Sequence, residues 1–300
     1  MLAVTILGNN SAIPAHGRHP TAQVVTTADD LLLFDCGEGT QIQILNYRIK
    51  RSRINHIFIS HLHGDHYFGL VGLLNSFALL NRVQPLHVYG PPELQQILEL
   101  QFRLGETHLP FPFTFHAIQK DGLLLDAPHY TVSCFSTKHR IACRGFLVRE
   151  KRHLRKVLPA EAAKYGLSTG SYRQLQRGED VTAPDGGLVA NAAVTLPNTH
   201  AKAYAFAADT LYDPNLAAIV KGVDLLYHET TYLHALAEKA SSRFHSTTKQ
   251  AASIAAEAGA KRLLIGHFSA KFEDLLPFET EAKAVFPNSE VALEGATYLV

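Results

Sequence analysis

A strand-length apolar run that ends in three histidines and an aspartate constrains this fold more than any other feature. The run is HIFIS at residues 56–60, and HLHGDH follows it at residues 61–66. Gly64 allows a tight turn, so the ring and carboxylate groups of the motif can point at one spot. These groups are His61, His63, Asp65 and His66. Imidazole and carboxylate together suit Zn²⁺, with Mn²⁺ or Fe²⁺ possible, so a metal site is expected where this strand turns into a helix.

Strand and helix patterns alternate over most of the chain. Strands are predicted at residues 2–7, 23–27, 31–35, 56–60, 86–89, 113–118, 130–136, 203–207, 224–228 and 262–265. Helices are predicted near residues 39–49, 67–80, 93–104 and 246–258, the last ended by Gly259. This alternation is typical of an α/β protein.

Two metal ions need more ligands than the first motif provides, and three candidates follow later strands. His139 comes after the strand at 130–136, Asp209 after the strand at 203–207, and His267 after the strand at 262–265. A single histidine or aspartate at a strand end often only caps backbone groups. Together with the motif, however, the three make seven ligands, enough for two ions bridged by one carboxylate.

The composition indicates an ordinary globular protein. The chain has 300 residues, 46% of them apolar, and can bury a large core. Its apolar runs are too short to cross a membrane, and the N-terminus lacks the features of a signal peptide. Three cysteines at no metal-like spacing fit a reducing compartment, so a cytoplasmic location is expected.

Residues 150–191 interrupt the alternation and are predicted to form a flexible inserted arm. Eight lysines and arginines lie between residues 149 and 177 against two glutamates, although the whole chain carries a net charge of only +1. Such an arm can bind nucleic-acid phosphates with a strong dependence on salt, and a merely solvated insertion is the alternative. The candidate substrate-binding residues are Arg149, Lys151, Arg152, Arg155 and Lys156.

A further histidine is the candidate general acid. His245, in FHST, immediately precedes the helix predicted at 246–258, and the amides at a helix N-terminus favour a phosphate nearby. The alternative is an ordinary exposed histidine before a Ser246 cap. By contrast, the alternating aromatic residues Phe111, Phe113 and Phe115 favour core packing over base stacking.

HLHGDH with a later His, Asp and His resembles the metallo-β-lactamase superfamily, and other phrases resemble its ribonuclease Z family. These phrases are GNNSAIP, LLLFDCGEGTQIQI, SFALLNRVQPLHVYGPPEL, LLYHETTY and FHSTTKQAASIA before LLIGHFS, so the resemblance spans about residues 4–285. It implies one metallo-β-lactamase domain over residues 1–300, an αβ/βα four-layer sandwich with the basic arm inserted. It also implies a homodimer and a zinc-dependent endoribonuclease that removes the 3′ trailer of precursor tRNA, leaving a 3′-hydroxyl.

The resemblance also implies roles for individual residues. One zinc would be held by His61, His63 and His139, and the second by Asp65, His66 and His267, with Asp209 bridging. Asp65 resembles the family's proton acceptor, and Glu229 the carboxylate that orients the histidine at 245. The arm resembles the family's tRNA-gripping exosite. Two departures affect the arm and the discrimination of 3′ ends: the arm reads GLSTGSYRQL, and Arg18 is followed by His19 and Pro20.

Two other functions fit parts of the same pattern. A hydrolase of a small phosphodiester, sulfate ester or lactone would share the metal ligands, but it has no need of a basic arm. A non-catalytic RNA-binding protein could keep the fold without the chemistry, and the complete ligand set argues against it.

Overall fold

The computed structural model of the protein describes residues 2–151, 155–197 and 201–300. The chain forms two compact units, a large one made of Met1–Val148 with Ala203–Val300 and a small one made of Arg149–Lys202. Among the described residues, no helix has both the length and the apolar character that crossing a lipid bilayer requires.

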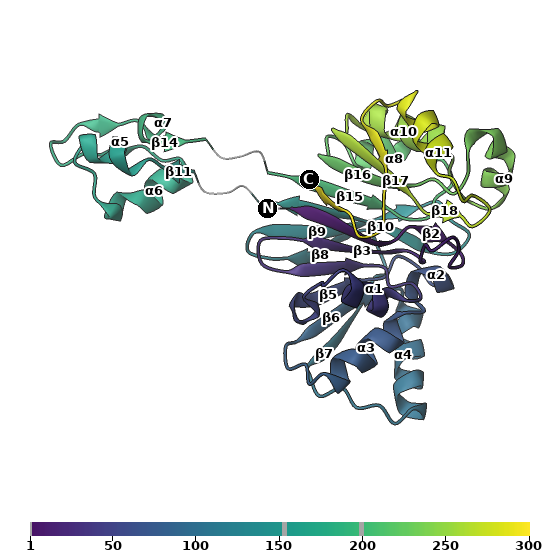
Figure 1. The fold of residues 1–300 in the computed structure, drawn as a ribbon. Helices are drawn as coiled ribbons and strands as arrows, with labels where there is room; N and C mark the ends of the chain where they lie inside the picture. The colour runs from purple at the N-terminus through teal and green to yellow at the C-terminus, as the bar shows by residue number, and fades with distance from the viewer. Residues whose placement is uncertain (1, 152–154, 198–200) are drawn as a thin grey trace. The chain divides into compact units, whose positions relative to one another are not determined.

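The large unit contains two seven-stranded sheets (Figure 1). In spatial order, the first sheet consists of β20 (Thr297–Leu299), β1 (Ala3–Gly8), β3 (Ala22–Thr26), β4 (Leu31–Phe34), β5 (Ile54–Phe58), β6 (Leu86–Gly90) and β7 (Phe113–Ala117). The second consists of β19 (Ser289–Val291), β17 (Arg262–Gly266), β16 (Leu225–Glu229), β15 (Ala203–Ala207), β10 (Cys143–Glu150), β9 (Tyr130–Thr137) and β8 (Gly122–Asp126).

The two sheets pack face to face, and helices cover their outer faces. Aromatic side chains of both sheets meet between them; the ring centroids of Phe34 and Phe146, for example, are 5.1 Å apart. On the first sheet lie α1 (Thr40–Asn46), α3 (Leu70–Leu79) and α4 (Pro92–Leu104). On the second lie α8 (Asn215–Ile219), α10 (Thr248–Ala258) and α11 (Leu276–Lys283). The result is the expected αβ/βα four-layer sandwich.

Parallel pairing brings the metal-ligand candidates to one edge. Strands β4 to β7 run parallel in the first sheet, and β15, β16, β17 and β19 run parallel in the second. Because the carboxyl ends of parallel strands lie at the same edge, the loops that follow them gather there. The HLHGDH motif follows β5, and the loops with Asp209 and His267 follow β15 and β17.

The structure differs locally from the predicted elements. The helix predicted over 67–80 is two helices, α2 (Gly64–Tyr67) and α3. Between them, Gly69 approaches the backbone so closely that an added Cβ would lie 2.1 Å from the carbonyl oxygen of Gly37. Strands β8 and β10 were not predicted, since GLLLD is short and charged residues interrupt CRGFLVRE.

The small unit is a folded body with a core of its own, which the sequence pattern did not predict for the inserted arm. Its elements are β11 (Lys156–Val157), α5 (Pro159–Lys164), α6 (Tyr172–Arg177), β12 (Val181–Thr182), β13 (Leu188–Val189), α7 (Asn191–Val194) and β14 (Thr195–Leu196). Strand β11 pairs with β14, which places the end of the unit beyond the expected boundary at 191. Short apolar side chains, including Leu175 and Val194, form its core.

Candidate metal centre

Seven side chains from four segments of the chain converge at the edge of the two sheets. They form two groups in which one ligand atom of each residue lies within 4.8 Å of the others. The first group is His61, His63, His139 and Asp209, and the second is Asp65, His66 and His267. The structure therefore brings together all seven residues that the sequence singled out.

The ring nitrogens face one another rather than solvent. Nε2 of His61 and Nε2 of His139 lie 2.9 and 3.0 Å from Nδ1 of His63. In the second group, Nε2 of His66 lies 3.3 Å from Nε2 of His267. Imidazole nitrogens gathered this closely around one point have the arrangement of a set of metal ligands.

Asp209 has the geometry of a carboxylate shared between the two groups. Its Oδ2 lies 3.7 Å from Nε2 of His61, and its Oδ1 lies 3.3 Å from Nε2 of His66. Oδ1 is buried and accepts no hydrogen bond from the described residues. Because an unsatisfied buried carboxylate oxygen is costly, this orphaned atom fits a bridging metal ligand.

Hydrogen bonds behind the ligands fix the orientation of their rings. The Nδ1 atom of His66 donates to Asp35 at 2.7 Å, that of His139 to the carbonyl of Phe244 at 3.0 Å, and that of His267 to Thr231 at 2.9 Å. In each case Nε2 is left free to bind a metal, and such partners also make the ligand more basic. His63 is the exception, since its Nδ1 faces the centre and its Nε2 accepts a hydrogen bond from Arg140 at 2.8 Å.

The electrostatics of the cluster favour cations. Burial lowers the pKa of His61 well below its usual value and that of His63 to about 4, so both rings are neutral at pH 7. For Asp209, burial alone would raise the pKa, but the neighbouring histidines hold it well below its usual range. Neutral imidazoles and ionised carboxylates are the forms that bind metals.

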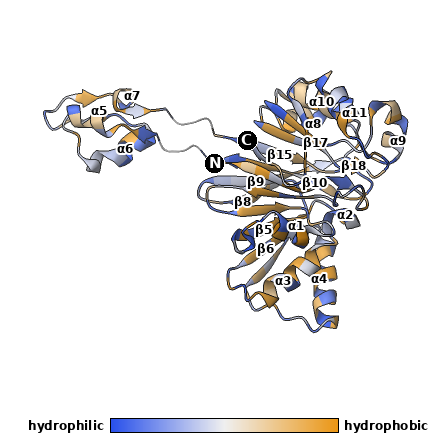
Figure 2. Cartoon of the chain, viewed as in Figure 1, coloured by the Kyte–Doolittle hydropathy of each residue, from blue (hydrophilic) through white to orange (hydrophobic). Residues whose placement is uncertain are grey.

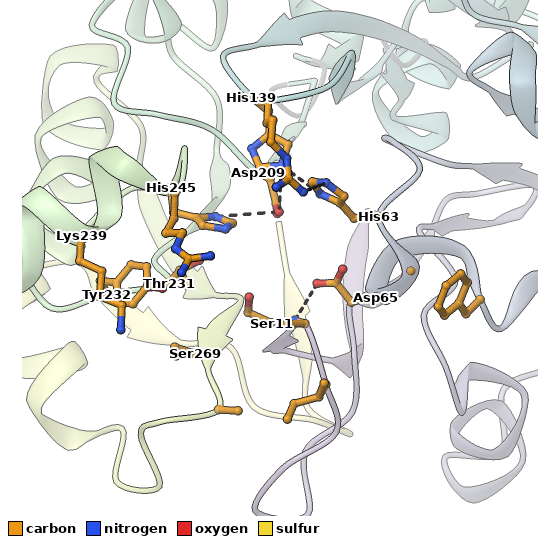
Figure 3. Close-up of a pocket in the computed structure, with 17 residues that line it drawn as sticks. Ser11, His63, Asp65, His139, Asp209, Thr231, Tyr232, Lys239, His245 and Ser269 are labelled. Carbon is orange, nitrogen blue, oxygen red and sulfur yellow. Dashed lines mark hydrogen bonds and ion pairs between the residues drawn. The ribbon is translucent and has the colours of Figure 1, made fainter.

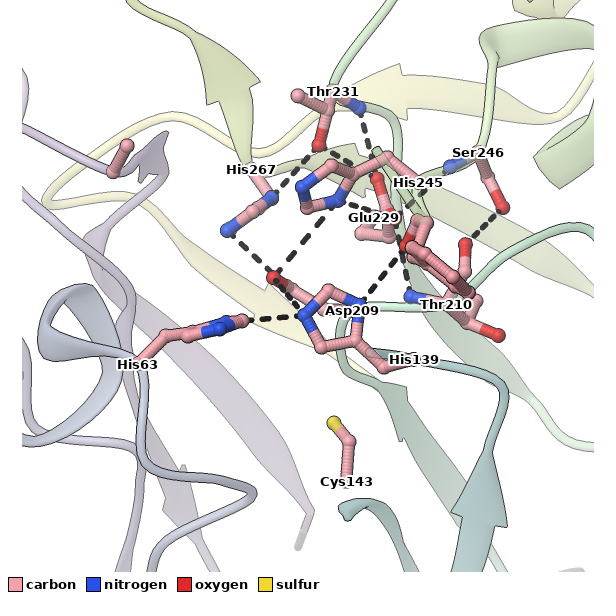
Figure 4. A network of polar contacts seen from close by, with 12 residues as sticks. His63, His139, Cys143, Asp209, Thr210, Glu229, Thr231, His245, Ser246 and His267 are labelled. Carbon is pink, nitrogen blue, oxygen red and sulfur yellow. Dashed lines mark hydrogen bonds and ion pairs between the residues drawn. The ribbon is translucent and has the colours of Figure 1, made fainter. Parts of the chain in front are cut away.

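A second buried network holds His245 beside the cluster (Figure 4). Nδ1 of His245 donates to Oε1 of Glu229 at 2.9 Å. The fully buried Glu229 also accepts hydrogen bonds from Thr210, Thr231 and the Ser246 amide. Burial alone would lower the pKa of His245, but the Glu229 carboxylate raises it to about 9.

The surroundings of His245 differ from the alternatives that the sequence left open. His245 is mostly enclosed rather than exposed, with 14% of its side chain accessible, and Glu229 beside it is fully buried. Helix α10 begins at Thr248 and is capped by Thr247, whereas the Ser246 hydroxyl donates to the carbonyl of Thr210. The ring of His245 is therefore held in place by Glu229 through Nδ1, and Nε2 is the ring nitrogen left to contact a substrate.

A pocket of about 590 Å³ opens over the cluster. His63, Asp65, His139, Asp209 and His245 line it together with Thr231 and Tyr232 (Figure 3). Three cationic side chains also line it: Arg140, Lys239 and Arg243. A pocket with metal ligands at its base and cations on its walls suits a phosphate ester.

Sequence reasoning missed several of these residues. Asp35 was predicted only as the last residue of a strand, yet it follows β4, the neighbour of β5, at the edge where His61 lies. Its position at the end of this strand was the feature of the sequence that could have identified it. Lys239 and Arg243 are spaced four residues apart just before His245, which is the spacing of one helix face. Arg140 and Tyr232 gave no signal beyond their proximity to ligands in the sequence.

The candidate arm residues have different environments within the small unit. Arg149 and Lys156 are exposed and Lys151 is half-buried, whereas Arg152 lies outside the described residues. Arg155 donates from Nε to the hydroxyl of Thr195 at 2.8 Å, so it has a structural role within the unit. Arg173 and Arg177 on α6 are two further exposed cations.

Sequence comparisons match curated relatives over almost the entire chain. The chain is 40% identical to ribonuclease Z of Parabacteroides distasonis over 294 residues, which is 97% of each protein. It is 41% identical to ribonuclease Z of Cytophaga hutchinsonii, covering 98% of this chain and 95% of the relative. A family described as Anti-Pycsar protein Apyc1 matches residues 2–153. That match ends before Asp209, Glu229, His245 and His267.

Comparisons with solved structures agree. The short form of human tRNase Z superposes with a TM-score of 0.72 and 26% identity, covering 99% of both chains. The metallo-β-lactamase fold protein YhfI from Bacillus subtilis superposes with a TM-score of 0.71 at 21% identity, covering 99% of this chain and 98% of that one, which shows the shared fold.

Proposed function

The chain belongs to the ribonuclease Z family, and we propose that it cuts precursor tRNA at the end of the mature sequence with two metal ions held by the seven-ligand cluster. As a member of this family, it is a tRNA 3′-processing endoribonuclease. The observation that carries the assignment to this pocket is the buried pair of His245 and Glu229 beside the cluster. The 3′-oxygen of RNA leaves as an alkoxide, which is a poor leaving group. The pair supplies the acid that protonates it.

Zinc is the proposed metal, because five imidazoles and two carboxylates make a donor set that suits it. His61, His63 and His139 would hold one ion and Asp65, His66 and His267 the other, with Asp209 between them. When bound, two such ions acidify a water molecule and neutralise charge that develops on the phosphate.

The chain's own residues then manage the protons. Asp65 accepts the proton of the attacking water; its carboxylate is oriented by the Ala12 amide, which donates to Oδ2 at 2.7 Å. The water oxygen bonds to phosphorus and the bond from phosphorus to the 3′-oxygen breaks. His245 donates a proton to that 3′-oxygen, leaving a 3′-hydroxyl on the tRNA and a 5′-phosphate on the trailer. Glu229 keeps the ring of His245 oriented and charged.

The small unit is proposed to grip the body of the tRNA. Its support is the exposed positive charge of Arg149, Lys156, Arg173 and Arg177 on a body with its own core. Lys151 and Arg152 belong to the same proposed surface. Arg155 is retained as a candidate contact, although its bond to Thr195 makes it a poor choice for mutation.

We also propose a homodimer. Its support is an exposed apolar face on two helices that pack against each other, α1 and α3. Helix α3 is hydrophobic over most of its length (Figure 2). The exposed apolar side chains here are Ile42 and Leu45 on α1, Leu79 at the end of α3, and Leu80 and Val83 in the segment that follows α3. Light scattering of the wild type and of Leu45→Lys tests this: a dimer that Leu45→Lys dissociates is expected, and a wild-type monomer contradicts the proposal.

A cytoplasmic location is the remaining proposal. The three cysteines, Cys36, Cys134 and Cys143, are buried and unpaired, as in a reducing compartment.

The activity is tested with a precursor tRNA that carries a 3′ trailer. Incubation with the zinc-loaded protein, followed by mapping of both product ends, should give one cut with a 3′-hydroxyl on the tRNA side. If the loaded protein instead hydrolyses bis(p-nitrophenyl) phosphate but leaves precursor tRNA intact, the pocket serves a small diester.

A further inference from the structure

Two cationic side chains, Lys239 and Arg243, line the pocket next to His245 and have no assigned role. Lys239 lies on α9 (Ala237–Ser242), and Arg243 follows that helix directly. Both side chains are exposed and both line the pocket. Across the described part of the chain, neither forms an ion pair with a carboxylate, unlike Lys261, which pairs with Asp224 at 2.7 Å. Their charges are therefore available to a ligand.

The ring of Tyr232 lies beside Lys239, one of the two cations. Nζ of Lys239 lies 5.5 Å from the centroid of the Tyr232 ring, a cation–π contact. The same ring is 8% exposed, and its centroid lies 6.3 Å from that of His245. The ring is too buried to stack a nucleobase. It separates the ammonium group of Lys239 from the imidazole of His245 by about one aromatic ring.

The position of His245 indicates in which direction an RNA strand would run through the pocket. Since His245 protonates the leaving 3′-oxygen, the ribose that carries this oxygen must lie on the His245 side. Figure 3 shows Lys239, Tyr232 and His245 on one side of Asp209, and Asp65 on the other. A strand that continues past His245 in the 5′ direction would bring its next phosphate toward the part of the pocket that Tyr232 and Lys239 line.

We propose that Lys239 and Arg243 bind the phosphate on the 5′ side of the last nucleotide that the tRNA retains. This inference rests on the proposed function and on the role of His245. Lys239 and Arg243 would then favour an RNA strand over a small diester, because a small diester has no second phosphate for them to bind. The contact orients the retained nucleotide so that its 3′-oxygen meets His245, which favours a continuous strand over an isolated diester.

A charge-removal cycle on the enzyme and the RNA tests the proposal. The enzyme arm is Lys239→Gln with Arg243→Gln, and the RNA arm is a methylphosphonate at that one phosphate of precursor tRNA. With the wild type, the neutral linkage should lower kcat/KM by roughly tenfold, which corresponds to about 1.4 kcal/mol. The double variant should show a comparable loss on unmodified RNA and no further loss on the modified RNA.

Controls distinguish binding by Lys239 and Arg243 from a general effect of positive charge on the protein surface. Lys221→Gln removes an exposed charge outside the pocket and should keep the full sensitivity to the methylphosphonate. Salt titration should show a shallower dependence of log kcat/KM for the double variant, by up to one unit of slope per contact. If the pair cannot be changed together without unfolding, Lys239→Gln alone should give a partial loss of sensitivity.

The outcomes are distinct. A wild-type enzyme that cuts precursor tRNA with the same kcat/KM when the linkage is neutral overturns the phosphate contact. A double variant that retains the full tenfold sensitivity assigns the phosphate to other residues and overturns the role of Lys239 and Arg243. A loaded wild-type enzyme that does not cut precursor tRNA at all contradicts the proposed function itself.

Discussion

The imidazole of His245 and the carboxylate of Glu229 form a hydrogen-bonded pair, 2.9 Å from Nδ1 to Oε1, at the edge of the metal cluster. The carboxylate accepts four more hydrogen bonds, from the amides of Thr210, Thr231 and Ser246 and from the Thr231 hydroxyl. Through that same hydroxyl it is linked to the metal-ligand candidate His267. One buried carboxylate thus positions both the acid and a ligand.

Replacing Glu229 should change the pH dependence of cleavage. His245 acts in its protonated form, and Glu229 raises its pKa to about 9. The active form is therefore present at neutral pH and is lost as the pH rises through the pKa. In Glu229→Gln the charge that raises the pKa is gone, so the alkaline fall of kcat/KM should move to lower pH. An unchanged alkaline limb in a folded variant would assign the acid elsewhere.

His245→Ala should discriminate between leaving groups. A 3′-alkoxide needs a proton, so cleavage of precursor tRNA should fall by about 10²- to 10⁴-fold. The nitrophenolate of bis(p-nitrophenyl) phosphate leaves without protonation, and its hydrolysis should fall far less. Metal content measured alongside should stay near that of the wild type. Equal losses on both substrates would mean that His245 supports the metal centre rather than the leaving group.

Asp65→Ala should separate turnover from binding. The variant loses the proton acceptor and one ligand candidate, so kcat should fall by about 10²-fold or more. Affinity for precursor tRNA, measured by fluorescence anisotropy, should change little because the small unit is assigned to binding. A parallel loss of affinity would contradict that division of roles.

Charge removal on the small unit should raise KM. Lys156, Arg173 and Arg177 are exposed and lie outside its core, so changing all three to Ala should leave it folded. KM for precursor tRNA should rise, the salt dependence of binding should become shallower by about one unit per lost contact, and bis(p-nitrophenyl) phosphate should be hydrolysed at the wild-type rate. Lys221→Gln is the control. An equal loss on the small diester would show that the unit is not a binding arm.

The sequence predicted the layout of the metal cluster because its ligands sit at strand ends. Within the second sheet, the ends of parallel strands share an edge, so single residues after β15 and β17 lie close together. The motif after β5 belongs to the first sheet and joins them because the two sheets pack face to face. The pattern could not predict that Asp209 Oδ1 is buried without a hydrogen bond from any described residue, or that Asp35 supports His66. Those facts depend on how the two sheets pack.

The small unit shows where sequence patterns were insufficient. Its core is built from alanine, valine and leucine residues scattered among charges and glycines, and no run is long enough to indicate a strand or helix. The pairing of β11 with β14 joins residues almost forty positions apart, which local periodicity cannot reveal. The excess of positive charge was readable in the sequence, but the fold that displays it was not.

The most direct test of the central claim is a metal titration of the chelator-stripped protein, with precursor tRNA cleavage and bound zinc measured in the same samples. The stripped protein should not cut precursor tRNA, and cleavage at the tRNA 3′ end should recover fully near two ions per chain. Full cleavage by a protein shown to hold no metal, or recovery complete at one ion with no second binding event, would contradict it.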